Sequence, residues 1–163
     1  MSETALTYLS RSPAQTEQIG ARLGALLKAG DVLCLVGDLG AGKTALARGV
    51  ALGWGSTTPA TSPTFVLIHE HRRPSDGARL QHIDAYRLER LEDAALLGLE
   101  DIFADENAVI IEWADRIAPL LPEDRLWIEL VGLPDDDHAR QLTFTAEGAR
   151  SLRLLKALKE ALR

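Results

Sequence analysis

The pattern of apolar and polar residues alternates between strand-like and helix-like segments along the chain. Residues 31–36 (DVLCLV) form a nearly continuous apolar run, which is typical of a central parallel strand covered on both faces. Shorter segments predict further strands at residues 5–9, 65–71, 80–85, 108–111, 126–131 and 141–145. Residues 72–79 (RRPSDGAR) contain the proline, aspartate and glycine of a surface turn, so the strands on either side of them are expected to form a hairpin.

Helical signals predict four helices among these strands. Ser12, Pro13 and Gln15 combine a capping box with a proline at the first helical position, which starts a helix there. Its apolar residues share one face, and Gly30 is positioned to close it. The other helices are expected over residues 43–52, 89–103 and 146–162. The alternation predicts a single α/β domain over residues 1–163, with a mixed, mostly parallel sheet flanked by helices in three layers.

Composition narrows the classes of function. The chain has 24 acidic residues against 18 lysines and arginines, for a net charge of −6, so no global basic field draws it to nucleic acid or anionic lipid. The single cysteine, Cys34, excludes an internal disulfide and is expected to be buried. The N-terminal segment lacks the features of a secretion signal, and no window approaches 18 consecutive apolar residues. A cytoplasmic protein without membrane contact is therefore predicted.

Residues 37–44 (GDLGAGKT) match the phosphate-binding loop pattern G-x-x-x-x-G-K-[ST] at every fixed position. Glycines let successive backbone N–H groups converge on phosphate oxygens, and the helix that follows adds its N-terminal dipole. Lys43 would reach the β- and γ-phosphates, and the Thr44 hydroxyl would bind Mg²⁺. A chance match is disfavoured because an apolar strand precedes the loop and a helical pattern follows it. The sequence predicts a P-loop NTPase-type fold that binds a nucleoside triphosphate.

Two acids, Asp84 and Glu112, end predicted strands. Open α/β sheets bind ligands at the carboxyl ends of their strands, so both carboxylates are expected on the side of Thr44. Burying a carboxylate is costly unless it is paired or bound to a metal. We therefore expect Glu112 to face magnesium. The alternative is that each is a strand-end acid in solvent.

Residues 61–65 (TSPTF) lie between the phosphate loop and Asp84. A hydroxyl-bearing loop at this point is typical of a switch that senses the γ-phosphate and its metal. The same residues are equally typical of a Ser/Thr-Pro turn that starts a strand. The sequence leaves these two interpretations open.

Several motifs in order, GDLGAGKT, TSPTF, HIDAYRLE, LLGLEDIF, IIEW and LPEDRLWIEL, closely resemble the TsaE (YjeE) family of bacterial tRNA threonylcarbamoyladenosine biosynthesis proteins. The resemblance covers nearly the whole chain, from about Thr16 to Gly148. It implies an ATPase with a P-loop α/β fold, acting with TsaD and TsaB in forming N6-threonylcarbamoyladenosine at position 37 of tRNA.

The resemblance also implies roles for individual residues. Thr44 and Glu112 would hold Mg²⁺, Asp84 would be an essential acid near the γ-phosphate, and Trp113 would be a functional neighbour of Glu112. The residues that would bind ATP are Thr16, Asp38, Leu39, Gly40, Ala41, Gly42, Lys43, Thr44 and Arg140. The departures from the family pattern are small: Ala45 replaces a threonine, Ala85 replaces a leucine, and Asp115 stands where a glutamate is usual.

The acidic balance suggests that the partners hold most of the tRNA, leaving this chain as a nucleotide-driven switch. Two other classes remain as alternatives, a small-molecule phosphotransferase and a nucleotide-binding module without turnover. A phosphotransferase usually needs a substrate-binding insertion and a lid, for which residues 72–79 are too short. A module without turnover would not require Asp84 and Glu112 together.

Trp113 directly follows Glu112, and strand alternation predicts that its side chain leaves the strand end on a different face. Its polar successors, residues 114–116 (ADR), favour an exposed indole that anchors a partner protein. The alternative is an indole that caps the end of the sheet as part of the core.

Overall fold

The computed structural model describes residues 4–38, 40–57, 68–88, 90–95, 98–104 and 106–163. Its strands are β1 (Ala5–Ser10), β2 (Val32–Val36), β3 (Ile68–Arg72), β4 (Arg79–Asp84), β5 (Asn107–Glu112), β6 (Arg125–Leu133) and β7 (Asp136–Glu147). Its helices are α1 (Pro13–Leu26), α2 (Lys43–Trp54), α3 (Leu91–Ala95), α4 (Leu99–Ala104), α5 (Ala149–Ala161) and the 3₁₀ segment η1 (Ala114–Leu120). Among the described residues, no helix is long and apolar enough to cross a membrane.

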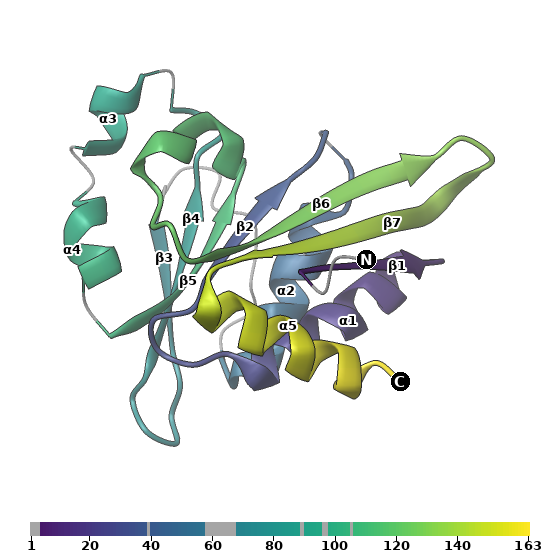
Figure 1. The fold of residues 1–163 in the computed structure, drawn as a ribbon, viewed down its shortest axis with the longest axis horizontal. Coiled ribbons are helices and arrows are strands. Elements are labelled where there is room, and N and C mark those ends of the chain that lie inside the picture. The colour runs from purple at the N-terminus through teal and green to yellow at the C-terminus, as the bar shows by residue number, and fades with distance from the viewer. Residues whose placement is uncertain (1–3, 39, 58–67, 89, 96–97, 105) are drawn as a thin grey trace.

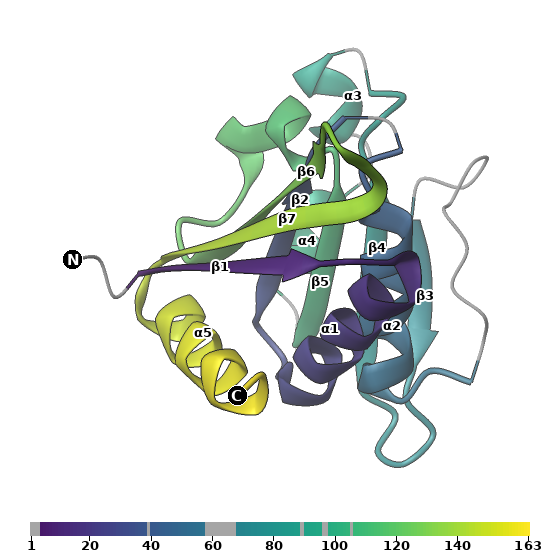
Figure 2. The same cartoon turned by 90° about the vertical axis from the view of Figure 1, so that its right-hand side faces the viewer.

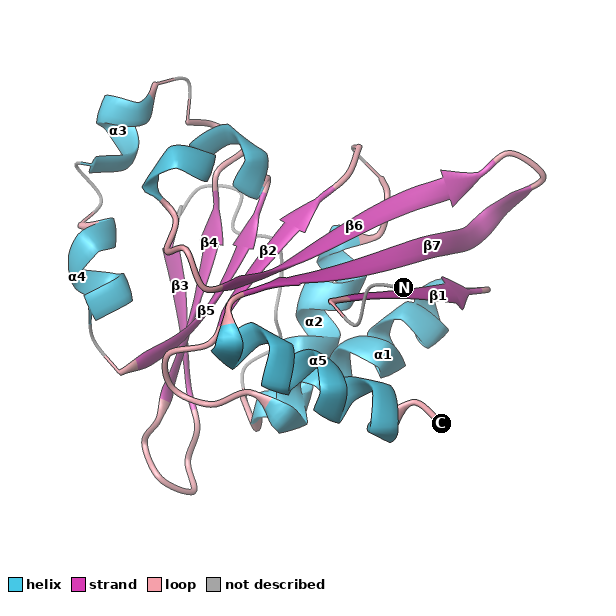
Figure 3. Cartoon of the chain, in the orientation of Figure 1, coloured by secondary structure: helices cyan, strands magenta, loops and turns pink. Residues whose placement is uncertain are grey.

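The strands form one sheet in the order β1-β7-β6-β2-β5-β4-β3 (Figures 1 and 3). The four central strands, β6, β2, β5 and β4, run parallel to one another. Antiparallel strands complete both edges, with β3 paired to β4, and β7 and β1 beyond β6. The predicted mixed sheet is confirmed, and so is the hairpin around residues 72–79.

Helices cover the sheet from two sides (Figures 1 and 2). α1, α2 and α5 pack on one face over a core that includes Leu33, Leu35 and Ile110. η1, α3 and α4 contribute to a second core on the other face, with Cys34 and Ile111. Cys34 is fully buried, as predicted. Alternate residues of β2 and β5 therefore point into different cores, which is why both strands read as continuous apolar runs.

α1 and α2 approach each other closely because glycines line their contact. A Cβ added to Gly49 of α2 would lie 2.0 Å from the backbone oxygen of Glu17, and one added to Gly24 of α1 would lie 2.1 Å from that of Val50. No side chain fits at either position without moving a backbone. This contact seats the helix that follows the phosphate loop directly against α1.

Several predicted boundaries are wrong, and long-range contacts explain them. α1 ends at Leu26, and Gly30 instead lies in the following turn, where its N–H donates to Asn107 O. The predicted helix over residues 89–103 is two short helices, with Gly98 between them at φ 72°. Residues 65–67 of the predicted strand lie outside the described residues.

β7 starts at Asp136, five residues before the predicted start at 141, and continues to Glu147. Its polar first residues carry no strand signal of their own. They are strand because they pair with the end of β6, where Gly132 lies opposite Arg140 and Leu133 opposite Asp136. The last helix accordingly begins at Ala149.

Candidate functional site

The phosphate-loop residues connect β2 to α2 at the carboxyl end of the parallel strands (Figure 1). Gly42 is the N-cap of α2 in the left-handed region, at φ 100°, and no described side chain caps this helix end. The N–H groups of its first turn are therefore open toward an anion, which the helix dipole favours. Gly40 has φ 80°, a conformation that glycine adopts without strain. Leu39 lies outside the described residues.

Lys43 is buried at the base of this loop. Its Nζ donates to the backbone oxygens of Gly37 at 2.6 Å and Asp38 at 2.7 Å, and it lies 4.0 Å from the centroid of the Trp113 ring. Burial lowers the pKa of Lys43, while the charge of Glu112 opposes that shift. The ammonium is held at the loop with carboxylates around it.

Glu112 ends β5 with its side chain almost fully buried. Its Oε1 lies 3.5 Å from Thr44 Oγ1, and its Oε2 lies 2.6 Å from His82 Nε2. Thr44 lies in the first turn of α2. The carboxylate of Glu112 and the hydroxyl of Thr44 therefore meet at the N-terminus of α2, next to the phosphate loop. Glu112 faces Thr44 on one side and an imidazole on the other.

Asp84 lies beside Glu112, because the two residues are partners in the parallel pairing of β4 and β5. Its Oδ1 accepts a hydrogen bond from Tyr86 N at 2.9 Å. Burial raises the pKa of Asp84, and the negative charge of Glu112 raises it further. The two strand-end acids thus lie together and largely out of solvent, rather than separately in water.

A cavity of about 580 Å³ opens between the phosphate loop and the β6–β7 hairpin. Arg140 of β7 crosses to the loop, where its guanidinium donates to Ala41 O at 3.1 Å and Gly40 O at 3.0 Å. These bonds tie together segments that are 100 residues apart. The cavity is lined by Gly37, Asp38, Gly40, Ala41, Glu129, Leu130, Val131, Gly132, Leu133, Asp137 and Arg140.

A model of the protein family described as threonylcarbamoyl adenosine biosynthesis protein TsaE matches residues 10–142. The chain belongs to the TsaE family. It is 41% identical to a Bacillus subtilis tRNA threonylcarbamoyladenosine biosynthesis protein TsaE, over 89% of this chain and 88% of the relative. It is 40% identical to the protein of the same name from Streptomyces coelicolor, over 82% of this chain and 91% of that relative.

A solved structure supports the same assignment. The crystal structure of Bacillus subtilis YdiB superposes with a TM-score of 0.82 at 36% identity, covering 98% of this chain and 97% of that one. The TsaE-family fold is therefore shared over nearly the full length of both chains. The family's role lies in the biosynthesis of threonylcarbamoyladenosine in tRNA.

Trp113 does not follow strand alternation in this TsaE-family chain. Its backbone is left-handed, at φ 59° and ψ 39°, which is unusual for a bulky residue and is associated with functional sites. The half-buried indole lies against Lys43, 5.0 Å from the ring centroid of Tyr86. Strand alternation, which predicted a different face from that of Glu112, does not set the direction of its side chain, because the strand conformation ends at Glu112.

Thr16 lies in the first turn of α1 and is buried. Its hydroxyl shares a 2.6 Å hydrogen bond with Ser10, and Ser10 is the β1 partner of Arg140. Thr16 is not among the residues that line the cavity, and within the described part of the chain its link to the site runs through Ser10, which pairs with Arg140 in the β1–β7 register. Residues 61–65 lie outside the described residues.

The oxygen donors at Thr44 and Glu112 fit a magnesium ion. Mg²⁺ prefers carboxylate, hydroxyl and phosphate oxygens at about 2.0–2.1 Å, so adjacent ligands lie about 3 Å apart. The 3.5 Å between Thr44 Oγ1 and Glu112 Oε1 is close to that spacing. In the described part of the chain, no group of three or more His, Cys, Asp or Glu side chains could hold a metal. Phosphate and water would have to complete the shell.

His82 is the residue of this site that sequence reasoning missed. The motif HIDAYRLE contains it, yet no role followed from the motif. Period-two alternation on β4 could have found it, because residues 82 and 84 share a face.

Proposed function

We propose that this chain binds ATP and Mg²⁺ at the phosphate loop and hydrolyses ATP. In this proposal it is the switch subunit for forming N6-threonylcarbamoyladenosine at position 37 of tRNA, together with partners of the TsaD and TsaB type. The observation that carries the proposal is the convergence of Lys43, Thr44 and Glu112 on the first turn of α2. A cation, a hydroxyl and a carboxylate at an open helix N-terminus match the needs of phosphoryl chemistry.

Each residue has a distinct part in this proposal. The N–H groups of the loop and of the first turn of α2 bind phosphate oxygens. Lys43 exchanges the oxygens of Gly37 and Asp38 for those of the β- and γ-phosphates. Thr44 and Glu112 would hold Mg²⁺, which when bound neutralises charge on the phosphates. The cavity beside the loop, with Arg140 on its wall, takes the nucleoside.

Asp84 is the better candidate for orienting the attacking water. Both oxygens of Glu112 already have neighbours, Thr44 and His82. Within the described residues, Asp84 accepts a hydrogen bond only at Oδ1, from Tyr86 N. Burial also raises the pKa of Asp84, which favours a role as a proton acceptor.

The charge balance supports a role through partners. With a net charge of −6, the chain is poorly suited to hold the tRNA backbone by itself. We expect the partner proteins to provide most of that contact, and ATP turnover to depend on their presence.

The test is nucleotide binding and ATP turnover with Mg²⁺, each measured for the chain alone and with the TsaD and TsaB type partners. Magnesium-dependent ATP binding and partner-stimulated phosphate release are expected. Absence of magnesium-dependent ATP binding would contradict the proposal. Phosphate transfer to a small acceptor would indicate a phosphotransferase, and binding without turnover under all conditions would indicate a passive module.

A further inference from the structure

The Glu112 carboxylate has two oxygens with different surroundings. Oε1 faces the Thr44 hydroxyl at 3.5 Å, and Oε2 faces His82 Nε2 at 2.6 Å. The side chains of His82 and Glu112 are only 2% and 3% exposed. Water therefore does not satisfy Oε2, and the imidazole N–H is its partner.

The sheet brings His82 to this place. His82 and Asp84 share one face of β4, and the β4–β5 register sets Asp84 beside Glu112 and His82 beside Ile110. The imidazole therefore reaches Glu112 diagonally, from one step below it on the neighbouring strand. His82 is buried, as is its register partner Ile110.

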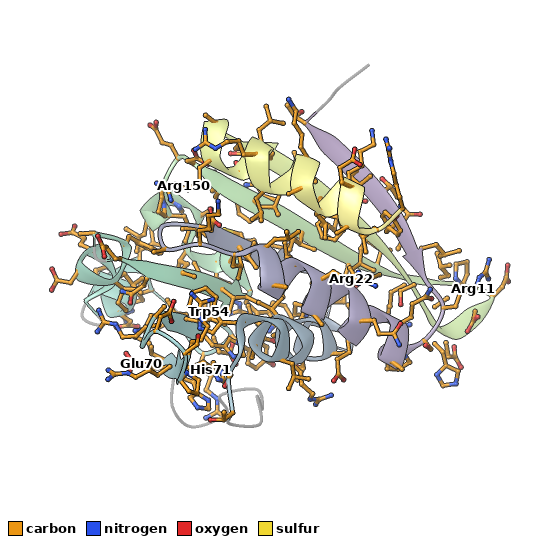
Figure 4. The ribbon with its side chains drawn as sticks, turned by 90° about the horizontal axis from the view of Figure 1, so that it is seen from below. Arg11, Arg22, Trp54, Glu70, His71 and Arg150 are labelled. Carbon is orange, nitrogen blue, oxygen red and sulfur yellow. The ribbon has the colours of Figure 1, made fainter. Side chains whose placement is uncertain are left out.

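Two further imidazoles, from His69 and His71 on β3, lie in a row beside the His82 ring. His71 on β3 stacks 6.2 Å from it, and His69 stacks 4.4 Å from His71. His71, which lies on the strand beside the end of α2 (Figure 4), shares a 2.9 Å hydrogen bond with Ser56 just after that helix. Burial, together with the charges of His69 and His82, lowers the pKa of His71 to about 4. His71 is thus uncharged at neutral pH.

From this geometry we infer that His82 is a positioning residue for magnesium. By holding Oε2, it turns the Glu112 carboxylate so that Oε1 faces Thr44, where the cation would bind. This inference rests on the proposed function. A buried carboxylate without that partner would carry an unsatisfied oxygen and would be free to rotate away from Thr44. Groups that orient a metal ligand in this way typically change metal affinity by about 10–100-fold.

Two variants of similar size test the inference. His82→Gln keeps an amide N–H that can donate to Oε2, and His82→Leu removes the donor. For each, ATP affinity is measured in EDTA and across a titration of Mg²⁺, and Mn²⁺ binding to the ATP-loaded protein is followed by electron paramagnetic resonance. His69→Ala is the matched control, because His69 pairs with His82 in the β3–β4 register and makes no hydrogen bond to Glu112.

For His82→Leu, we expect the Mg²⁺ and Mn²⁺ midpoints to rise by roughly 10–100-fold, with ATP affinity in EDTA unchanged. His82→Gln should recover most of the loss, and His69→Ala should match the unmodified chain. A purely structural role would lower the melting temperature of both His82 variants and leave the metal midpoints alone. That result would overturn the inference.

Two further outcomes are also decisive. If His82→Leu does not fold, His82→Asn replaces it, because asparagine is polar but one carbon too short to reach Oε2; equal midpoints for Asn and Gln would then overturn the inference. If the unmodified chain shows no magnesium-dependent ATP binding, the proposed function fails first. The two failures are therefore distinguishable.

Discussion

The half of the sheet formed by β2, β5 and β4 is buried at nearly every position. In the other half, β6 and β7 alternate buried positions with more exposed ones, and β1 is buried only at Ser10. Helices cover both faces of the first half. We call the second half the wing. Glu112, Asp84 and His82 all come from the buried half, and Arg140 comes from the wing.

A charged side chain has different energetic consequences in the two halves. In the buried half, a carboxylate is costly unless something compensates it, and the compensating groups are Thr44, His82 and backbone N–H groups. In the wing, Glu147 pairs with Arg125 at 3.2 Å near the surface, where such a pair contributes little. The buried half contributes the acids and the histidine of the site. The wing lines the cavity and, through Arg140, forms hydrogen bonds to the loop.

The largest effect is expected for Lys43→Ala, which removes the buried cation of the loop. ATP affinity should fall by roughly 100-fold, because a hydrogen bond to a charged group is worth up to about 3 kcal/mol. Isothermal titration calorimetry measures it, with Lys28→Ala as the control. Unchanged affinity would contradict the phosphate-loop assignment.

Glu112→Ala should separate binding from turnover. Removing a carboxylate from beside the phosphates reduces repulsion, so ATP binding should remain within a few-fold. Turnover should fall by at least roughly 100-fold, because the metal loses its protein carboxylate. The matched wing variant is Glu147→Ala, which should leave turnover unchanged. Normal turnover in Glu112→Ala would indicate that this acid is structural.

Arg140→Ala tests how much the wing contributes. It removes two hydrogen bonds to the loop oxygens of Gly40 and Ala41, so ATP affinity should fall by roughly 10-fold, the effect of about 1.4 kcal/mol. Arg125→Ala, elsewhere in the wing, should leave affinity unchanged. Equal effects of the two variants would mean that the hydrogen bonds from Arg140 to the loop do not contribute to ATP affinity.

The smallest expected effect is a gain in stability for Asp84→Asn. The raised pKa of Asp84 means that the fold favours the protonated acid. This contribution is fully present below the ordinary pKa of 3.8 and is lost as the pH rises through the raised value. Asparagine cannot ionise, so the nucleotide-free variant should melt at a higher temperature than the unmodified chain at pH 7. The gain should vanish as the pH falls toward 3.8.

Asp76→Asn gives the opposite sign and serves as the control for that experiment. The hydrogen bond with Arg73 lowers the pKa of Asp76 to about 2. Its stabilising contribution is present above the ordinary pKa and is lost as the pH falls toward 2. Calorimetric melting across this pH range measures both variants. A melting temperature for Asp84→Asn at or below that of the unmodified chain at pH 7 would contradict the raised pKa.

The sequence by itself determined the local features of this protein. The glycine-rich loop, the strand before it and the helix after it all lie within residues 32–54, and their signals are short-range ones: apolar runs, glycines and caps. The placement of Asp84 and Glu112 at the same edge of the sheet was also predicted, because parallel strands end at one edge, whereas their direct pairing follows from the β4–β5 register. The mixed α/β fold and the burial of Cys34 were also predicted correctly, because both follow from local patterns of apolar residues.

Tertiary structure decided what depends on contacts between distant segments. β7 includes polar residues because β6 offers them hydrogen bonds, and Arg140 reaches a loop 100 residues away. Trp113 turns left-handed where β5 gives way to η1, so alternation could not orient it. His82 reaches Glu112 because β4 and β5 lie side by side, and the carboxylate is buried away from water. A local pattern records a residue's own preference, whereas burial and a partner across the sheet are properties only of the packed chain.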